Sequence, residues 1–107
     1  LAWLDAGLST LDGTGLAERD KLAAAMAVLH FARGAAAIAL EAGDLDDAQF
    51  PGLLRRLVDA DRLPALAAAV HAGAFDRDDD GDDRHLAAFR SGLGQLLDGI
   101  AARIAAA

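Results

Sequence analysis

The sequence contains no cysteine and no tyrosine, and it has only one tryptophan and two prolines in 107 residues. Without cysteine, the chain has no disulfide framework, no thiolate metal site and no thiol nucleophile. Valine is also scarce and aromatic residues make up only 5% of the chain, so residues that favour strands are few. We therefore expect an all-α fold, a helical bundle formed by a single domain.

Basic residues are in short supply as well. Seventeen acidic side chains face ten basic ones, which gives a formal net charge of −7. Nucleic acids are polyanions, so this balance is a poor match to DNA or RNA. Lys21 is the only lysine beside nine arginines, and alanine is abundant, a composition typical of GC-rich bacterial genomes. We predict that these 107 residues do not bind DNA by themselves.

The beginning of the chain lacks three further features: an initiator methionine, a basic leader region and a signal-peptide cleavage site. Leu1 already belongs to a pattern with helical spacing, which it shares with Leu4, Leu8 and Leu11. We therefore expect these residues to be part of a longer protein.

The longest hydrophobic stretch runs from Leu22 to Leu40 and carries only His30 and Arg33 as side chains that can be charged. Its apolar residues occupy nearly every direction around a helix, which is typical of a helix covered on most sides. A membrane span is the rival interpretation, because about twenty apolar residues cross a bilayer. We reject a membrane span, because the stretch is mostly alanine and Arg33 near its middle would cost roughly 2.5–3.5 kcal/mol on insertion.

Glycine, proline and acidic segments divide the rest of the chain into further helices. Asp12-Gly13-Thr14-Gly15 ends the first helix, and Ala42-Gly43 ends the central one. Pro51 and Pro64 suit the first turns of the third and fourth. We expect helices at residues 1–11, 16–42, 50–58, 64–71 and 84–105. The last of these has a core stripe formed by Leu86, Phe89, Leu93, Leu96, Leu97, Ile100 and Ile104.

The acidic run Asp76–Asp83 begins like a calcium loop, with Asp76, Asp78, Asp80 and Gly81 at the appropriate positions. The twelfth position, which should supply a bidentate glutamate, is Ala87. We interpret the run as a solvated linker without calcium, and we expect no metal and no cofactor.

The three histidines lie far apart and show no spacing typical of metal ligands. We expect His71 and His85 to face solvent. His30 is either a hydrogen-bonded core residue or a polar point in a cavity. Arg33, inside an apolar stripe, needs a carboxylate partner if it is buried, and Asp98 is one candidate.

The sequence shows no motif typical of an enzyme active site. No serine or threonine lies in a nucleophile elbow, and no strand precedes the glycine-rich segments. No pair of carboxylates is helically spaced within an apolar stretch. We therefore assign no catalytic residues.

The last helix has a second face without charge, opposite its core stripe. Gly92, Gly94 and Gly99 together cost roughly 3 kcal/mol of helix propensity relative to alanine, and a close helix neighbour would explain them. We predict a two-fold homodimer held by Leu16–Ala42 and Arg84–Ala105, because each has more apolar or small surface than one core can cover. The predicted interface residues are Ala88, Gly92, Gln95, Gly99 and Ala102, with Gly34 from the central helix.

Several segments together resemble the regulatory domains of the tetracycline-repressor (TetR) family, in order and over essentially the whole chain. The segments are Trp3-Leu4, Leu8–Leu11, Thr14–Leu16, Lys21-Leu22, Phe31–Ala36, Leu54–Asp59, Arg62–Leu66, Ala72–Phe75, and Phe89 followed by Gly92–Ile100. The last resembles the pattern F-x-x-G-L-x-x-L-L-D-G of the final helix in such sequences. Each motif alone is weak, whereas their order and spacing are fairly specific.

The resemblance implies a cytoplasmic transcriptional repressor whose N-terminal helix-turn-helix domain binds operator DNA. Its C-terminal helical domain dimerises through a four-helix interface and binds a small effector. The resemblance also implies that residues 1–107 are a partial regulatory domain, from which the DNA-binding domain and the first regulatory helices are absent.

For the pocket of an apolar or amphipathic effector, the candidates are large or polar residues on the first two helices: Trp3, Met26, His30 and Phe31. We expect no membrane partner. Two other interpretations stay open: a helical dimerisation or scaffold module without a ligand, and a small helical-bundle enzyme.

Overall fold

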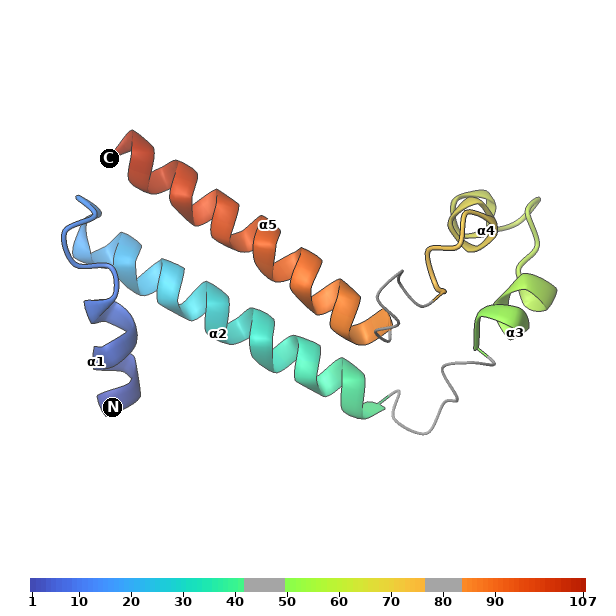
Figure 1. Ribbon diagram of the computed structural model, residues 1–107, viewed down its shortest axis with the longest axis horizontal. Coiled ribbons are helices and arrows are strands. Elements are labelled where there is room, and N and C mark those ends of the chain that lie inside the picture. The colour runs from blue at the N-terminus through green and yellow to red at the C-terminus, as the bar shows by residue number, and fades with distance from the viewer. Residues whose placement is uncertain (42–49, 77–83) are drawn as a thin grey trace. The chain divides into compact units, whose positions relative to one another are not determined.

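The structure is a computed structural model that describes residues 1–41, 50–76 and 84–107. All the regular secondary structure in these ranges is helical, which confirms the all-α prediction (Figure 1). The helices are α1 (Ala2–Ser9), α2 (Glu18–Glu41), α3 (Phe50–Leu57), α4 (Pro64–His71) and α5 (Arg84–Ala106). The bounds expected from the sequence agree with these within a few residues.

The largest difference lies between α1 and α2. The expected start of the central helix at Leu16 is wrong by two residues, because a turn occupies this position. Gly13 and Gly15 adopt positive φ angles of 78° and 83°, which are easily accessible only to glycine. The backbone N–H of Leu16 then donates a hydrogen bond to the Thr14 hydroxyl at 3.3 Å. The chain therefore becomes helical only after residue 17.

The described residues divide into two compact units, which we describe separately. The first contains residues 1–37 and 89–107, and the second contains residues 38–88.

In the first unit, α2 and α5 lie side by side and run antiparallel (Figure 1). The rings of Phe31 and Phe89 lie at one end of this pair, with centroids 5.5 Å apart. At the other end, Gly15 lies close to Ala107, so that a Cβ on Gly15 would be 3.6 Å from that of Ala107. Lys21 of α2 forms an ion pair with Asp12 after α1 (3.5 Å) and another with Glu18 (3.0 Å). The hydrogen bond that Lys21 donates to the Glu18 carboxylate raises the pKa of Lys21.

The second unit includes the hairpin of α3 and α4. Ala67 and Val70 of α4 are each 2% exposed, and they are the only buried residues in the part of the chain that the structure describes. Gly73, at φ 82°, ends α4 in a Schellman motif, in which Gly73 N–H bonds to the Val70 carbonyl and Ala74 N–H to that of Ala69. One guanidinium nitrogen of Arg55 donates to both carboxylate oxygens of Asp76, at 3.0 and 2.8 Å.

The central helix is less covered than the sequence predicts. No residue of α2 is buried within the described chain, and Leu22 is 44% exposed. The single chain therefore covers this helix only in part, and neighbours on its other sides, including a second subunit, stay a prediction. By length and composition alone, α2 also meets the requirements for a membrane span, the one helix to do so among the described residues.

Candidate functional site

Two grooves run along the α2–α5 pair, and both lie entirely within the first unit. Ala24 of α2 and Ile100 of α5 line both of them. The two grooves therefore lie on either side of the line along which these helices meet. We name them the Gly99 groove and the Trp3 groove after one residue of each.

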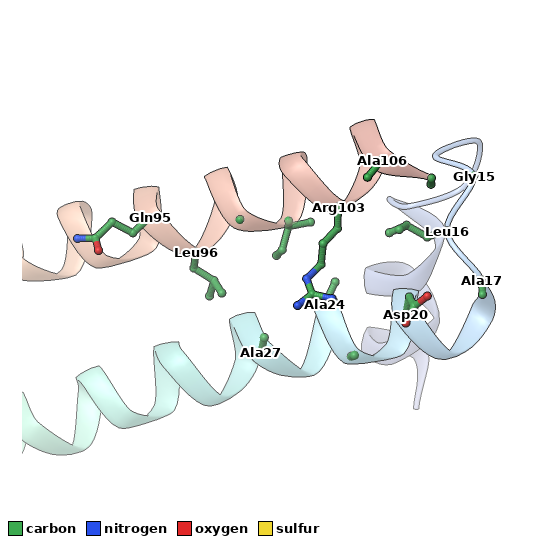
Figure 2. Close-up of a pocket in the computed structure, with 14 residues that line it drawn as sticks. Gly15, Leu16, Ala17, Asp20, Ala24, Ala27, Gln95, Leu96, Arg103 and Ala106 are labelled. Carbon is green, nitrogen blue, oxygen red and sulfur yellow. The ribbon is translucent and has the colours of Figure 1, made fainter.

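The Gly99 groove has a volume of about 800 Å³ and is lined mainly by small side chains of α2 and α5. Its lining comprises Gly15, Leu16, Ala17, Asp20, Ala23, Ala24, Ala27, Gln95, Leu96, Gly99, Ile100, Arg103, Ala106 and Ala107. Figure 2 shows Arg103 reaching from α5 toward α2, while Asp20 lies near the beginning of α2. One charge of each sign and the amide of Gln95 thus lie in a surface that is otherwise small or apolar.

Some residues of the predicted dimer interface line this groove, and others are exposed elsewhere on the single chain. Gln95 and Gly99 line the groove, and Gly34, Ala88 and Ala102 are exposed in the single chain. These positions are accessible to a second subunit, and their role in a dimer remains a prediction.

Gly92 has a different environment from the other predicted interface residues. A Cβ on Gly92 would lie 2.8 and 2.9 Å from the Cζ and Cε2 atoms of Phe31 in the same chain. The ring of Phe31 thus occupies the space that a side chain at position 92 would take inside one subunit, a contact that the sequence analysis missed. At Gly34, Gly94 and Gly99, by contrast, no described atom lies within 4 Å of such a Cβ.

The Trp3 groove has a volume of about 410 Å³ and lies among α1, α2 and α5. Its lining is apolar apart from Trp3 and Thr10, and it contains no charged residue in the described part of the chain. The lining residues are Trp3, Leu4, Gly7, Thr10, Leu11, Ala24, Ala25, Val28, Leu29, Ala32, Leu97 and Ile100. The Thr10 hydroxyl donates a hydrogen bond to the Gly7 carbonyl at 2.7 Å. Trp3, which is 58% exposed, is the one aromatic residue of this lining.

Of the four residues predicted for an effector pocket, Trp3 alone lines a groove in the described chain. Met26 and Phe31 are half-buried outside both linings, and Phe31 stacks on Phe89 instead. His30 is exposed, so neither the core nor the cavity position expected for it is found in the single chain.

The missed residues of the Trp3 groove are mostly small. Leu4, Gly7 and Leu11 recur at helical spacing on the side of α1 that carries Trp3, and this pattern could have identified them. Ala25 and Ala32 carried no such signal, because alanine occurs on every side of α2.

The structure corrects two further expectations about charged or polar groups. Arg33 is exposed in the single chain and makes no ion pair with Asp98 within the described residues, so it does not need the carboxylate partner that burial would require. His71 is exposed, as predicted. His85 is half-buried, and its Nε2 atom is buried without a hydrogen-bond partner in the described part of the chain. The expectation that His85 faces solvent is therefore wrong.

The acidic run is described only at its first residue, Asp76, which pairs with Arg55. The rest of the run, and with it the expected solvated linker, lies outside the described residues. Within the described ranges, no three His, Cys, Asp or Glu side chains are grouped so that they could hold a metal ion.

Comparison with models of protein families gives a match over most of the chain. The model of a family described as tetracyclin repressor-like, C-terminal domain, matches residues 1–104. No curated protein and no solved structure matches the chain.

Proposed function

Because the chain belongs to the tetracycline repressor-like C-terminal domain family, we propose that it dimerises and binds a small effector for a transcriptional repressor. Effector binding would then release operator DNA. The family consists of transcriptional regulators and is not an enzyme family. In this proposal the protein is cytoplasmic, and an N-terminal helix-turn-helix domain outside these 107 residues contacts the operator.

The observation that carries the proposal of a dimer is the exposure of α2. This helix is apolar over most of its 24 residues, yet none of them is buried in the single chain. Burial of apolar surface contributes roughly 25 cal/mol of favourable free energy per Å², and an exposed helix lacks this contribution. A second copy of the chain can cover it, because a two-fold axis brings the same face of both subunits together.

The Gly99 groove supplies a surface suited to that contact. Gly99, Ala23 and Ala27 are small, so helices of a second subunit can approach α2 and α5 closely. Stable obligate interfaces bury roughly 2,000 Å² or more, which requires the length of two long helices rather than one patch. We therefore assign the dimer interface to the exposed sides of α2 and α5 around this groove.

The effector is assigned to the Trp3 groove, on the other side of the α2–α5 pair. Ala24 and Ile100 belong to both linings. A ligand that displaces either residue therefore also displaces the surface that faces the partner. This shared boundary provides a route by which a small molecule could change the relative position of two subunits.

Two alternatives compete for the apolar surface of α2. A bilayer could cover the helix, because its length and composition are sufficient for a span. A scaffold module would use the same dimer face without a ligand. The membrane alternative predicts a chain that needs detergent to dissolve, whereas the scaffold alternative predicts the same dimer without binding of a small molecule.

The deciding experiment compares Gly99→Leu with Gly94→Leu by analytical ultracentrifugation over a concentration series. Both glycines lie in α5, and no described atom lies within 4 Å of a Cβ at either position. Only Gly99 lines the groove. We expect a dimeric wild type, a Gly94→Leu dimer of similar affinity, and a Gly99→Leu dimer weakened by about 1–3 kcal/mol per site through overpacking.

A monomeric wild type that dissolves without detergent would contradict the proposed dimer. A wild type that requires detergent would favour the membrane alternative. Equal dimer affinity for the two variants would move the interface away from Gly99.

A further inference from the structure

Gly7 of α1 occupies an unusual position in the Trp3 groove. It lies in the last turn of a short helix, where glycine has a lower helix propensity than alanine. Its φ angle is not positive, so the backbone does not require glycine there. No described atom lies within 4 Å of the position of a Cβ on Gly7, so close packing within the chain does not require it either.

The position of Gly7 in the lining gives a reason for the glycine. Gly7 lies one helical turn after Trp3 and four residues before Leu11, and all three line the same groove. A side chain at position 7 would project into space that the chain itself leaves empty. Glycine therefore keeps the groove open at the expense of helix stability.

The chemistry of the lining restricts what can occupy that space. The described lining residues carry no charge, and the hydroxyl of Thr10 is already engaged with the Gly7 carbonyl. A carboxylate, phosphate or ammonium group would lose its hydration here without gaining a partner, which is costly. Trp3 offers a flat aromatic surface and one indole N–H, which suit a ring compound. The volume of about 410 Å³ falls within the roughly 300–1,000 Å³ range of sites for drug-sized molecules.

We propose that the Trp3 groove binds an uncharged, apolar ring compound that lies over Gly7 against Trp3, and that Gly7 limits the size of the ligand. This inference rests on the proposed function and adds to it the chemical class of the effector and a residue that selects it.

The experiment uses two fluorescent probes with the same ring system. N-phenyl-naphthylamine is neutral, and its analogue anilinonaphthalene sulfonate carries one negative charge. Trp3 is the only tryptophan in the chain, so energy transfer from it to a bound probe measures binding to the chain, and the substitutions below locate the site. We expect saturable binding of one neutral probe per chain, and binding of the anionic analogue at least about tenfold weaker.

Two substitutions and a control locate the site. Gly7→Leu fills the groove and should weaken binding of the neutral probe at least about tenfold, with Gly7→Ala intermediate. Both substitutions favour the helical conformation, so the far-ultraviolet circular dichroism spectrum should keep its helical form. Gly94→Leu makes the same change in α5 outside the groove and should leave probe binding unchanged.

The outcomes separate this inference from the proposed function. Equal or tighter binding of the anionic analogue, still lost in Gly7→Leu, would overturn the ligand class while leaving effector binding intact. No binding of either probe, or binding that ignores Gly7→Leu, would overturn the site. A change of sedimentation mass in Gly7→Leu would show that a second copy occupies the groove. Dimerisation, tested at Gly99, is an independent readout of the proposed function.

Discussion

Gly92 and Gly94 lie two residues apart in α5, and their surroundings differ completely. A Cβ on Gly92 would lie within 3 Å of the Phe31 ring, whereas one on Gly94 would meet no described atom within 4 Å. Phe31 cannot move away without disturbing its contact with Phe89. The same residue type thus has a packing role at one position and none within the described chain at the other.

This difference predicts opposite effects of one substitution. Gly94→Ala should raise the free energy of unfolding by about 0.5–1 kcal/mol, because alanine is the better helix former. Gly92→Ala gains the same propensity but overpacks against Phe31, at a cost of about 1–3 kcal/mol. Urea denaturation of both variants at one protein concentration measures the difference. Equal stability of the two variants would show that the Phe31 contact does not constrain position 92.

At the scale of the element, helix ends are set by local backbone chemistry. The α4 helix begins with Pro64 in its first turn and ends with Gly73 in the left-handed region. Glycine at this position of a Schellman motif avoids the strain that a side chain would add. Asp76, which pairs with Arg55 of α3, also lies close to Gly73, since a Cβ there would be 3.1 Å from its Oδ2 atom.

Gly73→Ala should therefore destabilise the α3–α4 unit by about 1–2 kcal/mol, through the positive φ angle. Hydrogen exchange of the α3 and α4 amides should report the loss locally, with faster exchange there than in α2. The matched control is Gly52→Ala in α3, where no described atom lies within 4 Å of the added carbon and φ is not positive. Unchanged protection of α4 in Gly73→Ala would contradict the role assigned to the cap.

At the scale of the whole molecule, the net charge of −7 disfavours binding of DNA by these 107 residues alone. Contacts between basic side chains and phosphates supply most of non-specific DNA affinity, and this chain has an excess of acids. We expect no binding of a labelled duplex by fluorescence anisotropy at micromolar protein and low salt. A salt-sensitive rise in anisotropy would contradict this prediction and would place a basic surface on the chain itself.

The sequence alone was sufficient for the all-α class, for the helix positions to within a few residues, and for the family resemblance that the match over residues 1–104 confirms. These properties depend on local signals: glycine and proline positions, apolar periodicity, and the order of short motifs. Trp3 could also be selected as a groove residue from its size and position on the first helix.

Only the tertiary structure shows which apolar and small residues are covered by other helices and which are left exposed. Alanine and glycine occur on several sides of α2 and α5, so the sequence does not indicate which side of each helix is covered. That depends on packing partners contributed by residues far away along the chain. The structure places Gly92 against Phe31, leaves Gly7 and Gly99 open beside two different grooves, and exposes His30 and Arg33. Periodicity identifies which residues share a face of a helix, whereas the approach of a second helix determines which of those faces is covered.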